Sequence, residues 1–497
     1  MATTALENPI LNGPYEPPAR HFALGPSGPT GEIKAGRRPS ESFIPVPATR
    51  KGKKTGEQVA LDFDVTGERL ERNLLINEIR DQVELWRARS YPGVTPVTRK
   101  LLQHWADTAR EDRVLFCQRE AAETAISLAE VAGRQAGATD FRVRVDEQNA
   151  LHNAKLPRVA LKIATGSGKT VVMAMLIAWQ TINKVTSTRD ARFAKRFLVI
   201  APGITIRDRL RVLLPADSGN YYRERDLVPP DLWPHLNQAE VAITNYHTFL
   251  LRDAKEIQGV ASTTRKILNA GKSIDPFKET NDQMVSRVLR DLGGASGKAS
   301  EIVVFSDEAH HCYQNKIVTD PADVDDVDAE AKQRNAEARV WFKGLQAVHR
   351  KVGIKAIYDL SATPFYLQGS GYNEGFIFPW TVSDFSLMDA IESGIVKVPR
   401  IPIDDDATTS NVLHLRLWDE VGAELPKKKA KATAFGGPWV PPPALESALR
   451  SLHNSYAKAF DRWEESLAQA GEPPPVFIVV CPNTVVSKLV YEWIAGV

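Results

Sequence analysis

The stretch that decides the fold of this chain is residues 158–179, which read RVALKIATGSGKTVVMAMLIAW. Residues 159–163 predict a buried strand, and the apolar run from Val171 predicts a buried helix. The glycines between them allow a tight turn whose backbone N–H groups point toward an anion. A helix that begins at this turn adds partial positive charge. The segment therefore predicts a loop that holds nucleotide phosphates.

The side chains of this loop predict a site for ATP and Mg²⁺. Lys169 is expected to reach the β- and γ-phosphates, and the Thr170 hydroxyl is expected to ligate Mg²⁺. The general pattern G-x-x-x-x-G-K-[ST] begins with glycine, where this chain has Ile163. The strand–loop–helix context still favours a phosphate loop over a chance glycine-rich turn. The predicted nucleotide-binding residues of the loop are Thr165, Gly166, Ser167, Gly168, Lys169 and Thr170.

Two adjacent carboxylates follow another apolar run. Residues 302–305 read IVVF and lead into Ser-Asp-Glu-Ala-His at 306–310. Carboxylates at the end of a buried strand are costly unless they serve a metal or a reaction. Asp307 is predicted to hold Mg²⁺, and Glu308 to orient and deprotonate an attacking water. Glu308, Asp307 and Lys169 are thus the predicted catalytic residues.

A third motif, Ser361-Ala362-Thr363, follows the apolar run 354–360. The hydroxyls of Ser361 and Thr363 are expected to bridge from the acidic pair to the far side of the cleft. His310 is expected to couple the acidic pair to these neighbours, so all three are counted with the nucleotide site. Taken alone, the third motif is an ordinary Ser/Thr turn, and only its order and spacing make it informative.

The alternation of short apolar runs and helical segments within residues 151–400 predicts an α/β fold. Short apolar runs recur along this region, and each is followed by a turn and usually by a longer helical segment. This alternation implies a parallel sheet covered on both faces, with ligands at the carboxyl ends of its strands. The predicted strands are residues 159–163, 197–201, 241–244, 302–305 and 354–360.

The three motifs in this order resemble superfamily 2 DEAD/DEAH-box helicases and translocases, most closely the Res subunit of type III restriction enzymes. The resemblance covers residues 70–400 and resumes at 476–497. It implies a RecA-like P-loop NTPase lobe with a helical N-terminal extension and the start of a second such lobe. The narrower resemblance rests on the segments FCQREA at 116–121, IATGSGKT at 163–170, APGITIR at 201–207 and DEAHH at 307–311.

The resemblance implies further roles. Gln118 matches the glutamine that reads the adenine edge, although a surface helix glutamine is the alternative. Thr205 and Arg207 occupy the place of a motif that contacts the sugar-phosphate backbone of one strand, although an ordinary turn would look similar. Residues 245–247, Asn-Tyr-His, are placed at the next strand end and are a further candidate contact.

The function that this implies is an ATP-dependent helicase or translocase motor of a restriction-type enzyme, moving on duplex DNA. A modification or specificity methyltransferase subunit is the implied protein partner. Two alternatives stay open: a superfamily 2 helicase that acts on RNA or on repair DNA, and a nucleotide switch that does not hydrolyse ATP.

Changes in composition and pattern divide the sequence into five predicted regions. Residues 1–60, rich in Pro and Gly, predict a flexible arm whose basic run at 50–54 is a solvated tail rather than a DNA contact. Residues 61–150 predict the helical extension, 151–400 the ATPase lobe, 401–472 a linker with a helix over 445–470, and 473–497 the start of the second lobe, with a strand over 476–481.

The arginine finger of the second lobe and a nuclease are expected only beyond Val497. We therefore expect this N-terminal portion to bind Mg²⁺–ATP weakly and to hydrolyse it slowly. The one local match to a carboxylate–lysine nuclease pattern, Glu330-Ala331-Lys332, follows the acidic stretch 320–328 and is interpreted as part of a solvated loop.

Composition sets broad limits. The net charge of +2 over 497 residues gives no global basic field, so nucleic-acid contacts must be local. Three widely spaced cysteines suit a reducing cytoplasm rather than a disulfide framework. The N-terminus lacks a signal-peptide pattern, and the apolar helical run 171–179 is shorter than the roughly 18 residues of a membrane span. A cytoplasmic protein without a membrane span is expected.

Overall fold

The computed structural model describes residues 8–25, 28–45, 68–134, 140–252, 279–293, 302–314, 329–367, 370–398, 417–426 and 439–496. The chain divides into two compact units, Met1–Val398 and Pro399–Val497.

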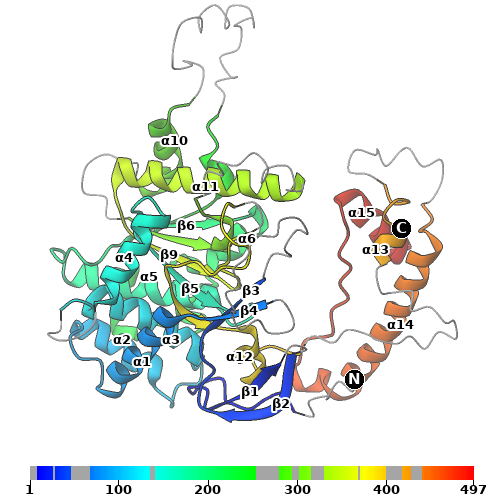
Figure 1. Cartoon of the computed structure of the whole chain (residues 1–497), viewed down its shortest axis with the longest axis horizontal. Coiled ribbons are helices and arrows are strands. Elements are labelled where there is room, and N and C mark those ends of the chain that lie inside the picture. The colour runs from blue at the N-terminus through cyan, green and yellow to red at the C-terminus, as the bar shows by residue number, and fades with distance from the viewer. Residues whose placement is uncertain are drawn as a thin grey trace, which may run out of the picture. The chain divides into compact units, whose positions relative to one another are not determined.

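The core of the first unit is a six-stranded parallel sheet with helices on both faces (Figure 1), which confirms the predicted α/β fold. Its strand order is β10-β5-β9-β8-β6-β7. The strands are β5 (Arg158–Ile163), β6 (Arg196–Ala201), β7 (Glu240–Asn245), β8 (Ile302–Asp307), β9 (Ile354–Ser361) and β10 (Thr381–Phe385). The first five were predicted; β10, which reads TVSDF, alternates with polar residues and has no continuous apolar run.

Alternate residues of the central strands belong to two separate hydrophobic clusters. Phe197 and Phe305 belong to the cluster that includes helix α5 (Lys169–Thr186), and Leu198 and Val304 belong to the cluster on the other face. Both sets are fully buried because side chains of a strand point alternately to its two faces. These strands are therefore covered on both sides, as their continuous apolar sequences predict.

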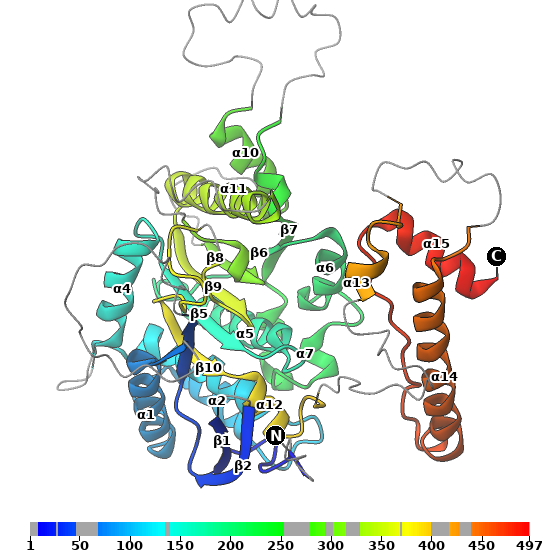
Figure 2. The same ribbon diagram turned by 45° about the vertical axis from the view of Figure 1, so that its right-hand side comes forward.

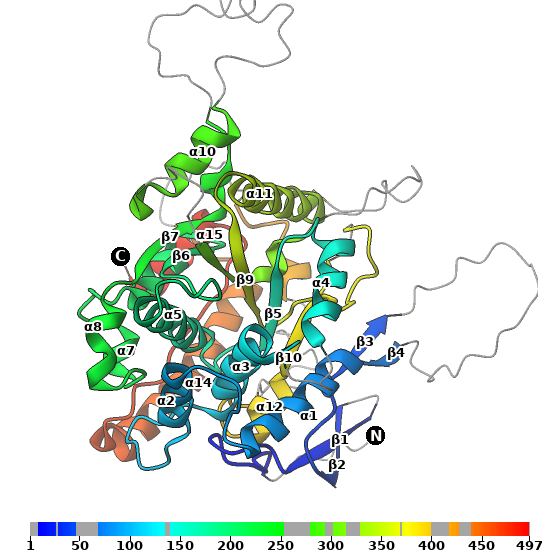
Figure 3. The ribbon, with the colours of Figure 1, turned by 90° about the vertical axis from the view of Figure 1, so that its left-hand side faces the viewer.

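Helices α1 (Leu74–Ala88), α2 (Pro96–Ala106) and α3 (Phe116–Ile126) pack on the α5 side. Figure 3 shows α2, α3 and α5 stacked side by side. Helix α3 continues into a five-residue π-helix, η1 (Ser127–Val131). The remaining longer helices among the described residues of this unit are α4 (Phe141–His152), α10 (Asn281–Val288) and α11 (Ala329–Val352).

Short helical segments follow several strands and fill the edges of the first unit (Figure 2). These are α6 (Ile204–Arg209), η2 (Leu210–Leu213), α7 (Tyr221–Glu224), η3 (Pro230–Leu232), α8 (Trp233–Leu236), η4 (Tyr246–Phe249), η5 (Arg290–Leu292), η6 (Ala309–His311) and α12 (Leu387–Glu392).

The expectation of a loosely ordered arm is wrong for the described part of residues 1–60. Strands β1 (Arg20–Gly25) and β2 (Gly28–Ala35) form one antiparallel pair. Strand β3 (Glu41–Pro45) pairs with β4 (Glu68–Arg72) in another. The basic run at 50–54 lies outside the described residues.

Buried ion pairs hold this N-terminal segment to helices of the first unit. Arg37 pairs with Glu120 of α3, and Arg38 pairs with Glu392 of α12, all with little exposed side-chain surface. Composition alone suggested disorder because it does not reveal that these arginines meet carboxylates from distant segments.

In the second unit, helices α13 (Leu417–Val421), α14 (Pro443–Ser466) and α15 (Thr484–Ala495) share a small hydrophobic cluster. Helix α14 confirms the predicted helix, and the short segment η9 (Ala468–Ala470) follows it. The predicted strand over 476–481 is wrong: these residues belong to no strand, and Val480 is 92% exposed. An extended apolar run needs a neighbouring strand to hydrogen-bond with, and the described part of this unit supplies none.

Within the described residues, no helix combines the length and the apolar character that crossing a membrane requires.

Candidate nucleotide site

The predicted phosphate loop connects β5 to α5 and adopts a tight turn. Gly166 and Gly168 have φ values of 84° and 82°, in the left-handed region that glycine enters without strain. Gly168 is also constrained by contact, because a Cβ there would lie 2.2 Å from Nε2 of Gln118. The backbone conformation therefore requires glycine at this position, and a larger residue would also displace the Gln118 amide.

The turn that carries Asp307 and Glu308 lies opposite this loop. Strand β8 ends at Asp307, and Glu308 then takes the left-handed conformation with φ 51° and ψ 50°. Such a conformation is unfavourable for a residue with a side chain and is concentrated at functional sites. The Lys169 Nζ atom lies 2.5 Å from Oε1 of Glu308. The two motifs, 139 residues apart in sequence, are thus in direct contact.

A cavity of about 550 Å³ joins the two motifs. Its volume is in the usual range of small-molecule sites, roughly 300–1,000 Å³. Eight of the predicted residues line it: Gln118, Thr165, Gly166, Gly168, Lys169, Thr170, Asp307 and Glu308. The residues that sequence reasoning placed around one triphosphate are therefore brought together at the carboxyl end of the sheet.

The carboxyl group of Asp307 is electrostatically unusual. Burial raises its pKa to about 6, and the neighbouring charge of Glu308 acts in the same direction. Lys169 and Arg209 oppose this rise. Asp307 therefore carries its negative charge above pH 6 but at a cost in solvation, which a bound cation would offset.

Behind Glu308, His310 and the third motif form a hydrogen-bonded chain. The Ser361 Oγ atom accepts from the backbone N–H of Thr363 at 3.0 Å and lies 2.9 Å from Nδ1 of His310. Burial, with the charge of His311 next, lowers the pKa of His310 to about 4, so its ring is neutral at pH 7. None of His310, Ser361 and Thr363 lines the cavity. His310 therefore links Glu308, whose Oε2 lies 3.5 Å from its Nδ1, to the third motif, and direct contact of these residues with the nucleotide stays a prediction.

Gln118 lies at the N-terminal end of α3 and bonds to the phosphate loop itself. Its Nε2 donates to the carbonyl of Ser167 at 3.0 Å, and its Oε1 accepts from the N–H of Leu115 at 3.1 Å. Only 6% of the residue is exposed, so the surface-glutamine alternative is wrong. The Ser167 side chain is fully buried and, among the described residues, its Oγ has no hydrogen-bond partner. Ser167 does not line the cavity.

Tyr15 also lines this cavity and was not predicted. The Pro14 carbonyl accepts from the N–H of Phe116 at 2.9 Å, which anchors the segment. The guanidinium of Arg113 lies 4.4 Å from the centre of the Tyr15 ring. Nothing local in the sequence marks this tyrosine, because its partners are about 100 residues away. The cavity also contains three cationic side chains that were not predicted, those of Arg113, Arg209 and Arg225.

The residues that were predicted to contact nucleic acid differ in whether they are exposed or buried. Arg207 is exposed and pairs with Asp208 at 3.0 Å, and the side chain of Thr205 lies outside the described residues. Tyr246 is buried and its ring stacks on that of Trp341, so the expectation that it faces a nucleic acid is wrong. His247 beside it is exposed.

The apparent nuclease match is located in a helix. Residues 330–332 belong to the first turns of α11, rather than to a loop, and Ala331 is buried. The acidic stretch 320–328 lies outside the described residues.

Comparison with known proteins agrees with this geometry. A family model described as "Type III restriction enzyme, res subunit" matches residues 115–365, about half of the chain. The matched region begins just before Gln118 and ends just after Thr363. No curated protein matches the chain.

Proposed function

This chain belongs to the family of type III restriction enzyme res subunits, and from that premise we propose that it is the Mg²⁺-dependent ATPase motor of a restriction-type DNA helicase or translocase. The family consists of helicase-like ATPases of superfamily 2. The observation that carries the proposal is the contact of Lys169 with Glu308 at 2.5 Å, inside a cavity that Thr170 and Asp307 also line.

Lys169 pairs with Glu308, the residue proposed as the general base. A triphosphate carries more negative charge than one carboxylate, so Lys169 would leave Glu308 for the phosphates. Glu308 would then be free to accept a proton from the attacking water. Phosphate binding and activation of the general base are thereby coupled through one lysine.

The residues present suit Mg²⁺. This ion is usually held by one or two carboxylates and hydroxyls together with phosphate oxygens and waters. Thr170 and Asp307 supply one oxygen ligand of each kind at the same cavity. Mg²⁺ would neutralise charge that develops on the phosphates, and its own charge would offset the poor solvation of Asp307.

Two substitutions test the ATPase proposal on the full chain. Lys169→Ala should abolish binding of a fluorescent ATP analogue. Glu308→Gln should retain binding but lower turnover by at least about 100-fold, the lower end of general-base effects. Lys343→Ala and Glu84→Gln are matched controls on exposed helix surfaces, and both should behave as wild type. Normal hydrolysis by Glu308→Gln would refute the assigned base.

The same test separates the proposal from a nucleotide switch that does not hydrolyse ATP. A wild-type chain that binds Mg²⁺–ATP with no turnover above that of Glu308→Gln would favour the switch. A measurable difference between the two proteins would favour the motor.

We propose that the motor moves on duplex DNA. Arg207 and His247 are exposed after β6 and β7, at the same end of the sheet as the phosphate loop. Contacts there would be made to the backbone, which separates DNA from RNA poorly. The test compares stimulation of the ATPase by duplex DNA, single-stranded DNA and RNA. Stimulation by RNA alone would assign the alternative, an RNA helicase. A methyltransferase subunit is the proposed protein partner, to be sought by co-purification.

A further inference from the structure

A second cavity, of about 450 Å³, opens at the amino ends of the strands, opposite the carboxyl ends where the candidate nucleotide site lies. It is lined where strands begin, at Arg158 of β5 and Lys355 of β9, whereas the phosphate loop and Ser361 lie where these strands end. Helices α3, α4 and α5 contribute its other walls. The cavity is therefore separate from the proposed ATPase site, and the two cavities share no lining residue.

The floor of this cavity is apolar. Ala125, Leu128 and Val145 line it and are buried, and Ala129 beside them is half-buried. Leu128 and Ala129 belong to the π-helix η1, a local widening of the helix that is frequent at functional sites. An apolar surface of this kind suits the flat hydrocarbon body of a ligand.

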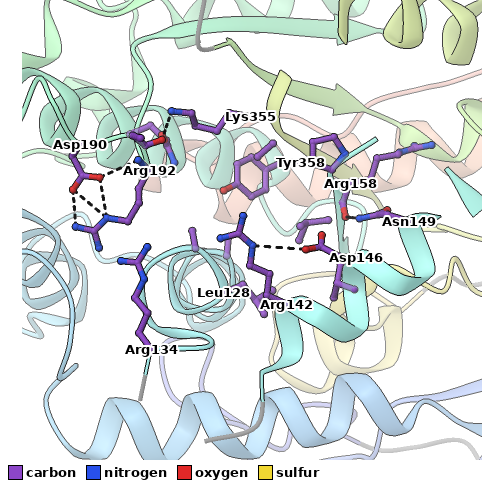
Figure 4. A pocket seen from close by; sticks show the side chains of 18 residues that line it. Leu128, Arg134, Arg142, Asp146, Asn149, Arg158, Asp190, Arg192, Lys355 and Tyr358 are labelled. Atoms are coloured by element: carbon purple, nitrogen blue, oxygen red, sulfur yellow. Dashed lines mark hydrogen bonds and ion pairs between the residues drawn. The ribbon is translucent and has the colours of Figure 1, made fainter. Parts of the chain in front are cut away.

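The rim of the cavity is cationic. Figure 4 shows the side chains of Arg134 and Arg142 extending into the same space, toward which Tyr358 also points. Arg192 lines the cavity too, but its Nη2 is held by Asp190 at 2.6 Å. Arg158 is not available, because its fully buried guanidinium bonds to Asp359 at 2.7 Å.

Arg134 and Arg142 are the two arginines of the cavity with capacity to bind a ligand, whereas the Lys355 ammonium donates to the carbonyls of Ala191 and Phe193. Arg134 is exposed and, among the described residues, makes no ion pair within 4.0 Å, although, after the hydrogen bond from Arg192, its charge helps to lower the pKa of Asp190. Arg142 has a carboxylate partner, Asp146, only at the long distance of 3.9 Å, with 59% of each side chain exposed. Ion pairs this exposed are weak, so an anion that bonds to the guanidinium would displace Asp146 readily.

We propose that this cavity is a binding site for a small organic acid, whose flat apolar body lies on Leu128 and Val145 and whose carboxylate bonds to Arg134 and Arg142. The proposal does not depend on the ATPase proposal. A polynucleotide suits the site less well, because a cavity of about 450 Å³ has the size of a small-molecule site.

The test uses 1-naphthoate as probe and isothermal titration calorimetry on the full chain. Naphthoate should bind with a submillimolar Kd, and the neutral 1-naphthamide at least about tenfold more weakly, because charge-assisted hydrogen bonds are lost. The double variant Arg134→Gln/Arg142→Gln should also bind naphthoate at least about tenfold more weakly. Arg99→Gln, an exposed arginine of α2 that does not line the cavity, should bind like wild type.

A second variant and two competitors complete the test. Ala129→Leu, which fills the floor without a change of charge, should weaken naphthoate binding, and saturating ATP should leave it unchanged. The proposal is overturned if naphthoate does not bind, if the amide or the double variant binds equally well, or if ATP displaces naphthoate from the nucleotide cavity. Displacement by a short DNA duplex would likewise overturn it and assign the arginines to nucleic acid.

Discussion

Replacement of Asp359 by asparagine should destabilise the first unit strongly. Asp359 of β9 and Arg158 of β5 are both fully buried, and Arg158 Nε donates to Asp359 Oδ2 at 2.7 Å. The same guanidinium donates to Asn153 and to the carbonyl of Cys312, which follows the acidic motif. One arginine thus ties together segments next to all three motifs of the nucleotide site. The indole N–H of Trp380 donates to the same Asp359 oxygen at 2.9 Å.

The size of the effect follows from burial. Removal of one partner of a buried pair costs about 3–5 kcal/mol, because a charge is left without its counter-charge. Asparagine still offers an oxygen to Arg158 and Trp380, so Asp359→Asn should cost about 3 kcal/mol, the lower end of that range. This is a large share of a typical stability of about 5–15 kcal/mol.

Urea unfolding followed by tryptophan fluorescence measures this loss. The double variant Arg158→Met/Asp359→Asn should cost at least about 2 kcal/mol less than the sum of the two single changes, because it buries no unpaired charge. The control Asp231→Asn, which removes an exposed pair with Lys100, should leave the unfolding midpoint unchanged. A loss below about 1 kcal/mol for Asp359→Asn, or additive single changes, would refute this reasoning.

Three further predictions concern the site. Burial raises the pKa of Asp307 to about 6, so the carboxylate that we propose to bind Mg²⁺ becomes protonated as pH falls through 6. The kcat/KM for Mg²⁺–ATP should therefore fall about tenfold per pH unit below that value, and a flat profile from pH 5 to 8 would contradict the proposal. Tyr15→Ala should weaken ATP binding by about 3- to 10-fold, because a stacking contact between the ring and the base would be lost. Binding of inorganic triphosphate, which has no base, should be unchanged. The control Tyr15→Phe, which keeps the ring, should bind ATP like wild type. Ser361→Ala removes the oxygen shared by His310 and Thr363 and should lower kcat with the Kd for ATP unchanged; weaker ATP binding would mean that the hydroxyl acts at the nucleotide.

Local sequence patterns were sufficient for the parts of the site that lie on single segments. The phosphate loop needs glycine at 166 and 168, a buried strand before it and a buried helix after it, and all of these are contiguous. The acidic pair likewise follows a strand that is buried along its whole length. Five of the six strands were predicted for the same reason.

Features that depend on distant contacts were not predictable in this way. Tyr15 reaches the cavity only because the N-terminal segment hydrogen-bonds beside Phe116, and β10 is a strand only because it pairs with β5. The opposite error occurred at 476–481, where an apolar run of strand-forming residues has no paired neighbour among the described residues. Strand propensity describes a residue's fit to a sheet, and the sheet must be present for it to act.

The most direct test of the account is a crystal structure of the chain with Mn²⁺ in place of Mg²⁺ and a non-hydrolysable ATP analogue. The account predicts an anomalous manganese signal between Thr170 and Asp307, with Lys169 turned from Glu308 to the phosphates. Manganese or phosphates located away from these four side chains would contradict it.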